Sequence, residues 1–197
     1  MKIKISFFAV MLILSLVLSS SYYAFIPLIS AAIHELGHIV CAKLFGVKLS
    51  GFELGIFGAR ISTESSLCSY SAEIAIAFAG PLCNLICADI TAILYSIAKV
   101  PSKIVSIFII SSLTLGITNL LPIKSFDGGR IFSALLSKVL DISSVETILD
   151  ITSFLSLFFI WSLSLYLLLR TSASLSLFVF SLSIFSNIFI SENKNFL

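Results

Sequence analysis

The only two histidines of this chain lie four residues apart, in the segment His34-Glu-Leu-Gly-His38. On an α-helix, residues i and i+4 share one face, so both imidazoles could bind the same metal ion. Glu35 is turned about 100° from His34 and stands beside that face, where its carboxylate can accept a proton from water. The pattern His-Glu-x-x-His is typical of two zinc ligands and a general base. The segment therefore predicts hydrolysis at a zinc ion.

The alternative is that these are two structural histidines in an ordinary helix. The surrounding segment, from Phe25 to Phe45, is otherwise largely apolar. Ionisable side chains inside an apolar span are costly and usually serve a function. The metal-binding interpretation is therefore favoured.

The composition indicates a polytopic membrane protein. Of the 197 residues, 58% are hydrophobic and 11% are charged, whereas soluble domains carry about 25% charged residues. We expect an all-α fold with about six transmembrane helices, forming a single membrane-embedded domain over residues 1–197. The predicted spans are residues 4–21, 23–45, 72–98, 103–121, 147–169 and 172–190.

The segment after the second predicted span has a different pattern. Residues 46–71 contain four glycines and alternate apolar with polar side chains around Phe52 and Arg60. Alternation with period two predicts a short membrane-associated β-hairpin, whose edge could pair with an extended peptide. A plain cytosolic loop is the alternative.

The basic residues predict the orientation in the membrane. With the predicted spans, nine lysines and arginines fall on one side and three, Lys99, Lys103 and Arg170, on the other. The positive-inside rule then places both termini in the cytoplasm. The sequence has no basic cluster that would indicate nucleic acid binding.

A catalytic zinc ion usually has three protein ligands, and the histidines supply only two. A carboxylate or a thiolate must supply the third ligand, and depth in the membrane separates the carboxylate candidates. His38 lies roughly 10 Å from the cytosolic end of its helix, by helical rise. Asp127 follows the fourth predicted span on the same side, in a break made by Pro122 and two glycines, and is the first choice. Asp89, inside the third predicted span, is the second choice.

Three stretches together resemble the site-2 protease family of intramembrane zinc metalloproteases. They are residues 31–38 around the two histidines, residues 79–84 (Ala-Gly-Pro-Leu-Cys-Asn), and residues 119–130 from Asn119 through Asp127. The resemblance implies that His34, His38 and Asp127 bind zinc, with Glu35 catalytic. It also implies that Asn84 and Asn119 bind the substrate. The compact form is similar to the stage IV sporulation FB branch of that family.

The predicted function is cleavage of a membrane-tethered protein, such as a pro-sigma or anti-sigma factor, near its cytosolic end. The expected partners are this substrate, the lipid bilayer and a membrane regulatory protein. The expected location is a bacterial cytoplasmic or forespore membrane. A catalytically silent scaffold for single-span partners is one alternative, although a scaffold has no need of Glu35. A metal transporter is the other, although the sequence shows no paired half-repeats.

Overall fold

The computed structural model describes residues 2–5, 22–47, 49–55, 58–63, 69–98 and 102–171. Two compact units can be distinguished, Met1–Leu120 and Leu121–Leu197, and each is described by itself. The elements in chain order are β1 (Lys2–Ile5), η1 (Tyr22–Phe25), α2 (Ile26–Leu44), β2 (Leu49–Gly55), β3 (Gly58–Thr63), α3 (Tyr70–Ala98), α4 (Lys103–Asn119), α5 (Asp127–Leu136) and α6 (Ile142–Thr171). The prediction of one domain over residues 1–197 stays a prediction.

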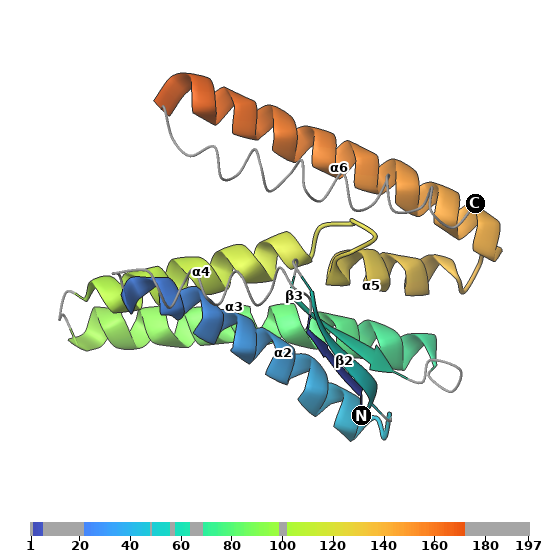
Figure 1. Ribbon diagram of the computed structural model, residues 1–197, viewed down its shortest axis with the longest axis horizontal. Coiled ribbons are helices and arrows are strands. Elements are labelled where there is room, and N and C mark those ends of the chain that lie inside the picture. Colours follow the sequence, from blue (N-terminus) through green and yellow to red (C-terminus); the bar gives the residue numbers. More distant parts are fainter. Residues whose placement is uncertain are drawn as a thin grey trace. The chain divides into compact units, whose positions relative to one another are not determined.

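Small residues bring the three helices of the first unit close together. Helices α2, α3 and α4 pack against one another (Figure 1). A Cβ atom on Gly37 of α2 would lie 2.7 Å from the carbonyl oxygen of Ala79 on α3. A Cβ atom on Gly116 of α4 would lie 3.2 Å from the carbonyl oxygen of Pro81. Such close backbone approach is typical of helices that associate in lipid, where small residues line the contacts.

A buried pair of hydroxyls joins α2 to α4. Ser30 and Ser112 are both fully buried, and their Oγ atoms lie 3.0 Å apart. Each hydroxyl can donate and accept, so the pair satisfies polar groups that would be costly to leave unbonded in an apolar interior.

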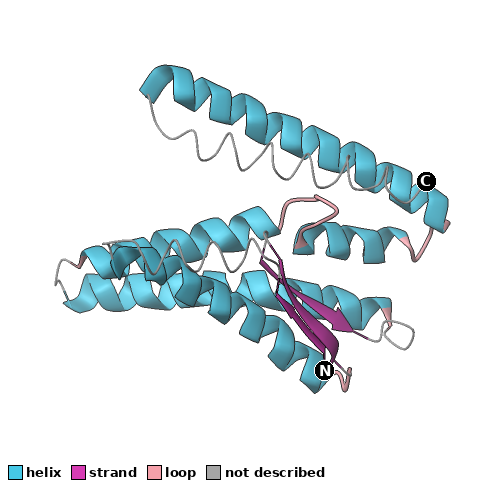
Figure 2. Cartoon of the chain, in the orientation of Figure 1, coloured by secondary structure: helices cyan, strands magenta, loops and turns pink. Residues whose placement is uncertain are grey.

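The strands of the first unit form a three-stranded mixed sheet in the order β1-β2-β3 (Figure 2). β1 pairs with β2 in parallel, with Lys2 opposite Gly51 and Ile5 opposite Leu54. β2 pairs with β3 in antiparallel fashion, with an irregularity between Leu49 and Gly51. β2 is therefore hydrogen-bonded on both sides, and the outer edges of the sheet belong to β1 and β3.

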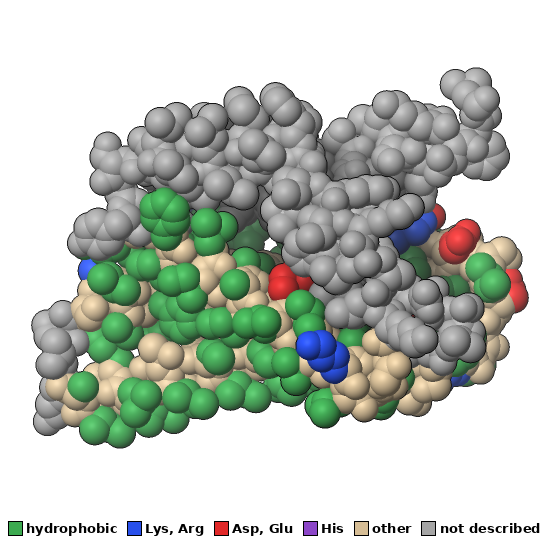
Figure 3. All heavy atoms as spheres, turned by 60° about the horizontal axis from the view of Figure 1, so that its bottom comes forward, with side chains coloured by type: hydrophobic (Ala, Val, Ile, Leu, Met, Phe, Trp, Pro, Cys, Tyr) green, Lys and Arg blue, Asp and Glu red, His purple; other side chains and the backbone are tan. Residues whose placement is uncertain are grey.

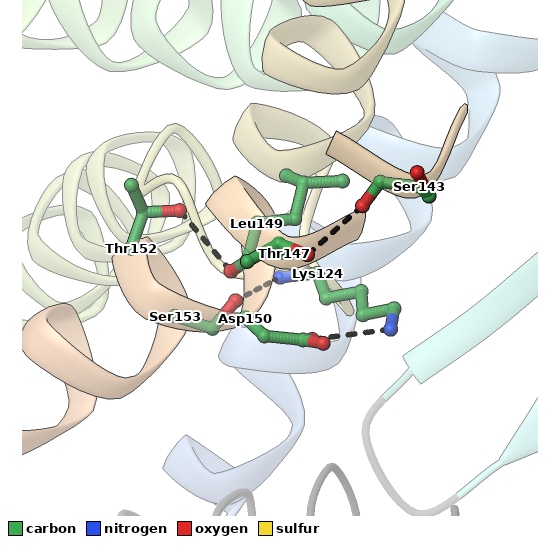
Figure 4. A network of polar contacts seen from close by, with 7 residues as sticks. All are labelled: Lys124, Ser143, Thr147, Leu149, Asp150, Thr152 and Ser153. Carbon is green, nitrogen blue, oxygen red and sulfur yellow. Dashed lines mark hydrogen bonds and ion pairs between the residues drawn. The ribbon is translucent and has the colours of Figure 1, made fainter. Parts of the chain in front are cut away.

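In the second unit, a turn before α5 is bonded to α6. The backbone N–H of Lys124 donates to Ser153 Oγ at 2.9 Å, and Lys124 Nζ lies 3.1 Å from Asp150 Oδ1 (Figure 4). A Cβ atom on Gly129 would overlap the carbonyl group of Ile123, so only glycine lets the turn fold back on the start of α5. These contacts fix the backbone immediately before Asp127.

Asp141 caps the N-terminus of α6. Its carboxylate accepts hydrogen bonds from the hydroxyls of Ser143 and Ser144 and from the backbone N–H of Ser144. The hydroxyl of Ser143, followed by the groups of Ser144, lowers the pKa of Asp141 to about 2. The cap is therefore ionised at neutral pH, as a carboxylate at a helix N-terminus should be.

Among the described residues, two helices are long and apolar enough to cross a membrane: Tyr70–Ala98, with 29 residues, and Ile142–Leu167 within α6, with 26 residues. Helix α4 is apolar but has 17 residues. Large hydrophobic side chains such as Ile97 and Phe159 are exposed on these helices. On the face shown in Figure 3, hydrophobic side chains are spread over the described residues, as contact with lipid would require.

The predicted fold class, all-α with about six transmembrane helices, is wrong, although the predicted hairpin is present as the antiparallel pair β2 and β3. The described residues form five α-helices, of which two meet the length and apolarity of a span. The strands form a three-stranded sheet that includes the N-terminal segment. Lysine and isoleucine alternate over Lys2–Ile5, a period-two pattern that the predicted span 4–21 overlooked. Residues 6–21, and the predicted span 172–190, lie outside the described residues.

One smaller prediction also needs correction. Asp127 was expected inside a helix break, but it is the first residue of α5, and the break lies before it at residues 121–126. Asp89, the second choice for the third ligand, has an exposed side chain on α3.

We predict that Gly37→Ala will destabilise the first unit. The added methyl group must displace the backbone of Ala79, at a cost that outweighs the gain of about 1 kcal/mol in helix propensity. A net loss of about 1–2 kcal/mol in the free energy of unfolding is expected. Leu36→Ala, at a neighbouring side chain that is 56% exposed, is the control and should change stability by about 0.5 kcal/mol or less. Unfolding in detergent micelles measures both; equal stability of Gly37→Ala and the native chain would contradict the prediction.

Candidate metal centre

Helix α2 holds both histidines on one buried face. His34 is 4% exposed and His38 is 6% exposed. Their ring centroids lie 4.8 Å apart, with the ring planes at 83° to each other. Glu35, which directly follows His34 on the helix, is half-buried. The one-turn spacing in the sequence thus places two imidazoles side by side, with a carboxylate next to them.

The backbone of α3 orients His38. The Nδ1 atom of His38 lies 2.7 Å from the carbonyl oxygen of Ile76. A carbonyl oxygen can only accept, so Nδ1 carries the hydrogen and the lone pair of the neutral ring is on Nε2. Histidines that bind metals are commonly held in this way, by a partner on the nitrogen that does not bind the metal. His38 is therefore set to bind a metal through Nε2.

Gly80 makes room for that nitrogen. A Cβ atom at position 80 would overlap the His38 ring, with Nε2 as the nearest atom. Gly80 itself is buried within α3. The position must therefore be glycine if His38 is to keep this orientation.

Asn84 lies against the other histidine. Its side chain is fully buried, and its Nδ2 lies 3.3 Å from Nδ1 of His34. Ile76, Gly80 and Asn84 are spaced by four residues and so form one stripe of α3. This stripe faces the two histidines, which are also spaced by four.

Asp127 belongs to the second unit, where it begins α5. Its side chain is buried, and Oδ1 lies 3.7 Å from Nη1 of Arg130. The N-terminus of a helix favours a carboxylate, because the unpaired N–H groups there carry partial positive charge. The start of α5 and Arg130 therefore both favour a negative charge on Asp127.

The remaining predicted residue, Asn119, is the last residue of α4 and is half-buried. Its Nδ2 donates to the carbonyl oxygen of Leu115 at 2.9 Å, one turn earlier in the same helix. A substrate-binding role for Asn119 stays a prediction.

The donor set fits zinc. His34, His38 and Asp127 are all buried, and each offers one ligand atom. Two imidazole nitrogens and one carboxylate oxygen are a ligand set that catalytic zinc commonly has.

Sequence reasoning missed the contributions of Ile76 and Gly80. Ile76 acts through its carbonyl oxygen, which every residue has, so no residue type could have indicated it. Gly80 carries a signal, because it stands one turn before the buried Asn84. That spacing could have placed it on the same face as Asn84.

Comparison with known proteins reveals a family match and several similar proteins, of which two follow. The profile of Peptidase family M50 matches residues 22–102 and 90–163. Zinc metalloprotease MJ0392 of Methanocaldococcus jannaschii is 33% identical over 140 residues, which cover 68% of this chain and 41% of that protein. Stage IV sporulation protein FB of Bacillus subtilis is 30% identical over 114 residues, which cover 57% of this chain and 40% of that protein. The chain thus spans about two fifths of the length of these relatives.

A solved structure also matches over most of both chains. The site-2 protease from Methanocaldococcus jannaschii matches with a TM-score of 0.63 and 27% sequence identity. The match covers 93% of this chain and 88% of that chain.

We predict that Gly80→Ala will weaken metal binding by at least about 10-fold, because the new methyl group must displace the His38 ring. Gly116→Ala is the matched control, since it also adds a methyl group to a buried helix contact but touches no histidine. Titration of each purified variant with zinc against a competing chelator gives the affinities. Native affinity in Gly80→Ala would show that the His38 orientation described above is not the one that binds metal.

Proposed function

Because the chain belongs to Peptidase family M50, we propose that it is a zinc endopeptidase that cleaves membrane-tethered proteins within the bilayer. The match to a site-2 protease structure confirms the predicted family resemblance, and proteins of this family are integral to the membrane. The observation that carries the proposal is the buried pair His34 and His38, side by side on α2 with Glu35 next to them.

The proposed zinc ligands are His34, His38 and Asp127. Their burial and their ligand types support this assignment. When zinc is bound, it supplies a Lewis acid that polarises a carbonyl group and lowers the pKa of water toward roughly 7. The protein supplies the geometry, through the partners on α3 and the turn before α5.

Glu35 is the proposed general base. It lies one residue from His34 and is half-buried, so it is close to the ligand face without being one of the three ligands. Its carboxylate would take a proton from the attacking water and pass it to the leaving amine.

The substrate is expected to bind in an extended form. A helix keeps its carbonyl groups in its own hydrogen bonds, so a transmembrane substrate must unwind near the cut. The sheet of the first unit offers an edge for such a segment. β2 is paired on both sides, and β3 has a longer outer edge than β1, six residues against four. β3 is therefore the proposed receiving strand.

The proposed substrates are membrane-tethered regulators of the pro-sigma or anti-sigma class, cut near their cytosolic end. Support comes from the similarity to a stage IV sporulation protein. A role in sporulation is therefore the first role to test. The proposed location is a bacterial cytoplasmic or forespore membrane. A membrane regulatory protein is the further proposed partner.

The proposed orientation places the sheet and the segment that follows α4 in the cytoplasm. Pairing of β1 with β2 keeps Lys2 and Lys4 on the same side as Arg60, which supports the positive-inside assignment. Lys103, at the start of α4, would then lie on the opposite side.

The metal assignment predicts which variants lose zinc. His34→Ala and Asp127→Ala should lose zinc, whereas Glu35→Gln should keep it and lose cleavage of a single-span reporter protein by about 100-fold or more. Asp89→Ala is the control for Asp127→Ala, because Asp89 is exposed. Metal analysis of the purified variants measures the zinc content of each. If only Asp89→Ala lost zinc, Asp89 and not Asp127 would be the third ligand.

The orientation predicts the pattern of cysteine labelling. The four native cysteines are first replaced by serine, and Lys103→Cys or Lys138→Cys is then added. An impermeant maleimide should label position 103 in intact cells and position 138 only after permeabilisation. The reverse pattern would overturn the orientation.

A further inference from the structure

The amide of Asn84 is the one place on the α3 stripe where the hydrogen bonding conflicts with metal binding. Asn84 is fully buried, and its Nδ2 faces Nδ1 of His34 at 3.3 Å. Among the residues that the structure describes, its Oδ1 is buried without a hydrogen-bond partner. A buried carbonyl oxygen without a donor is rare in folded proteins.

With Nδ2 facing Nδ1, the amide favours the tautomer of His34 that cannot bind a metal through Nε2. If Nδ2 donates to Nδ1, that nitrogen has no hydrogen, and the neutral ring must carry its hydrogen on Nε2. An Nε2 atom that carries a hydrogen has no lone pair for a metal. His38 is different, because the Ile76 carbonyl keeps the hydrogen on Nδ1.

Rotating the Asn84 amide by 180° removes the conflict with metal binding. The oxygen and nitrogen of an amide have nearly the same shape, so their assignment follows from the hydrogen bonds around them. After rotation, Oδ1 accepts a hydrogen bond from Nδ1–H of His34, and the lone pair of that ring is on Nε2. The two histidines are then held alike, each by an oxygen of α3 on Nδ1. The Asn84 amide nitrogen then takes the former place of Oδ1.

We infer that Asn84 is a positioning residue, whose Oδ1 holds His34 in the tautomer that binds zinc through Nε2. The inference rests on the proposed function, because it takes the zinc site as given. It differs from the substrate-binding role that the sequence predicted for Asn84, since the amide acts through His34 rather than on the substrate. A substrate-binding residue would change KM and leave zinc affinity unchanged, whereas a positioning residue changes zinc affinity without any substrate present.

Zinc affinity of the purified full chain, measured by competition with a chelator, separates these roles. Asn84→Leu has a similar size but no acceptor and should bind zinc about 10- to 100-fold more weakly. Asn84→Asp keeps an oxygen acceptor and should stay within about 3-fold of the native affinity, if the acceptor is what matters. Ser112→Ala, which removes one partner of the buried hydroxyl pair away from the histidines, is the control and should bind zinc normally. Native affinity in Asn84→Leu would overturn the inference.

A second measurement needs no variant. The chain has only two histidines, so nitrogen-15 NMR of the zinc-loaded protein shows two imidazoles. Both should carry hydrogen on Nδ1 and bind zinc through Nε2; a ring that binds through Nδ1 would overturn the inference even if Asn84→Leu fails to fold. If His34→Ala binds zinc as well as the native chain, the zinc site itself is wrong and the proposed function fails with it. Native zinc binding that depends on His34 but not on Asn84 overturns the inference alone.

Discussion

The hydrogen bond between His38 Nδ1 and the Ile76 carbonyl oxygen is the contact on which the candidate site depends. At 2.7 Å it fixes both the hydrogen position and the direction of the ring. It can form only because α2 and α3 approach closely, and that approach requires glycine at positions 37 and 80. Helix packing and ligand orientation are therefore one constraint: a methyl group that separates the helices also removes the histidine from its partner.

The same constraint explains how polar groups are distributed in a chain with an apolar surface. Lipid does not favour contact between apolar helices in the way water does, so close packing and interhelical hydrogen bonds must hold them. The described interior accordingly contains small and polar residues, such as Ser30, Ala77 and Ser112, while large hydrophobic side chains point outward. A buried histidine pair fits such an interior, because neighbouring helices can provide oxygen partners at short range.

The sequence predicted what residue types and helical spacing determine. The helices containing the histidines and Asn84 were expected at residues 23–45 and 72–98, and the structure has them at Ile26–Leu44 and Tyr70–Ala98. It did not predict strand β1, because four alternating residues were hidden at the start of a long apolar run. It placed Asp127 in a break because paired glycines usually end helices. Gly129 instead has a packing role, because the absence of a Cβ atom lets the preceding turn at Ile123 fold back on α5.

The two histidines differ in how their orientation can be lost. His38 is held by a backbone oxygen, which remains whatever side chain replaces Ile76, so its partner fails only if the helices move apart. His34 is held by a side-chain amide, which substitution removes and rotation inverts. An amide that presents nitrogen rather than oxygen to Nδ1 would keep the packing of α2 against α3 and still withhold the Nε2 lone pair. Metal binding at His34 thus depends on which of two orientations the Asn84 amide adopts. The two orientations have nearly the same shape, so hydrogen bonding alone determines which one forms.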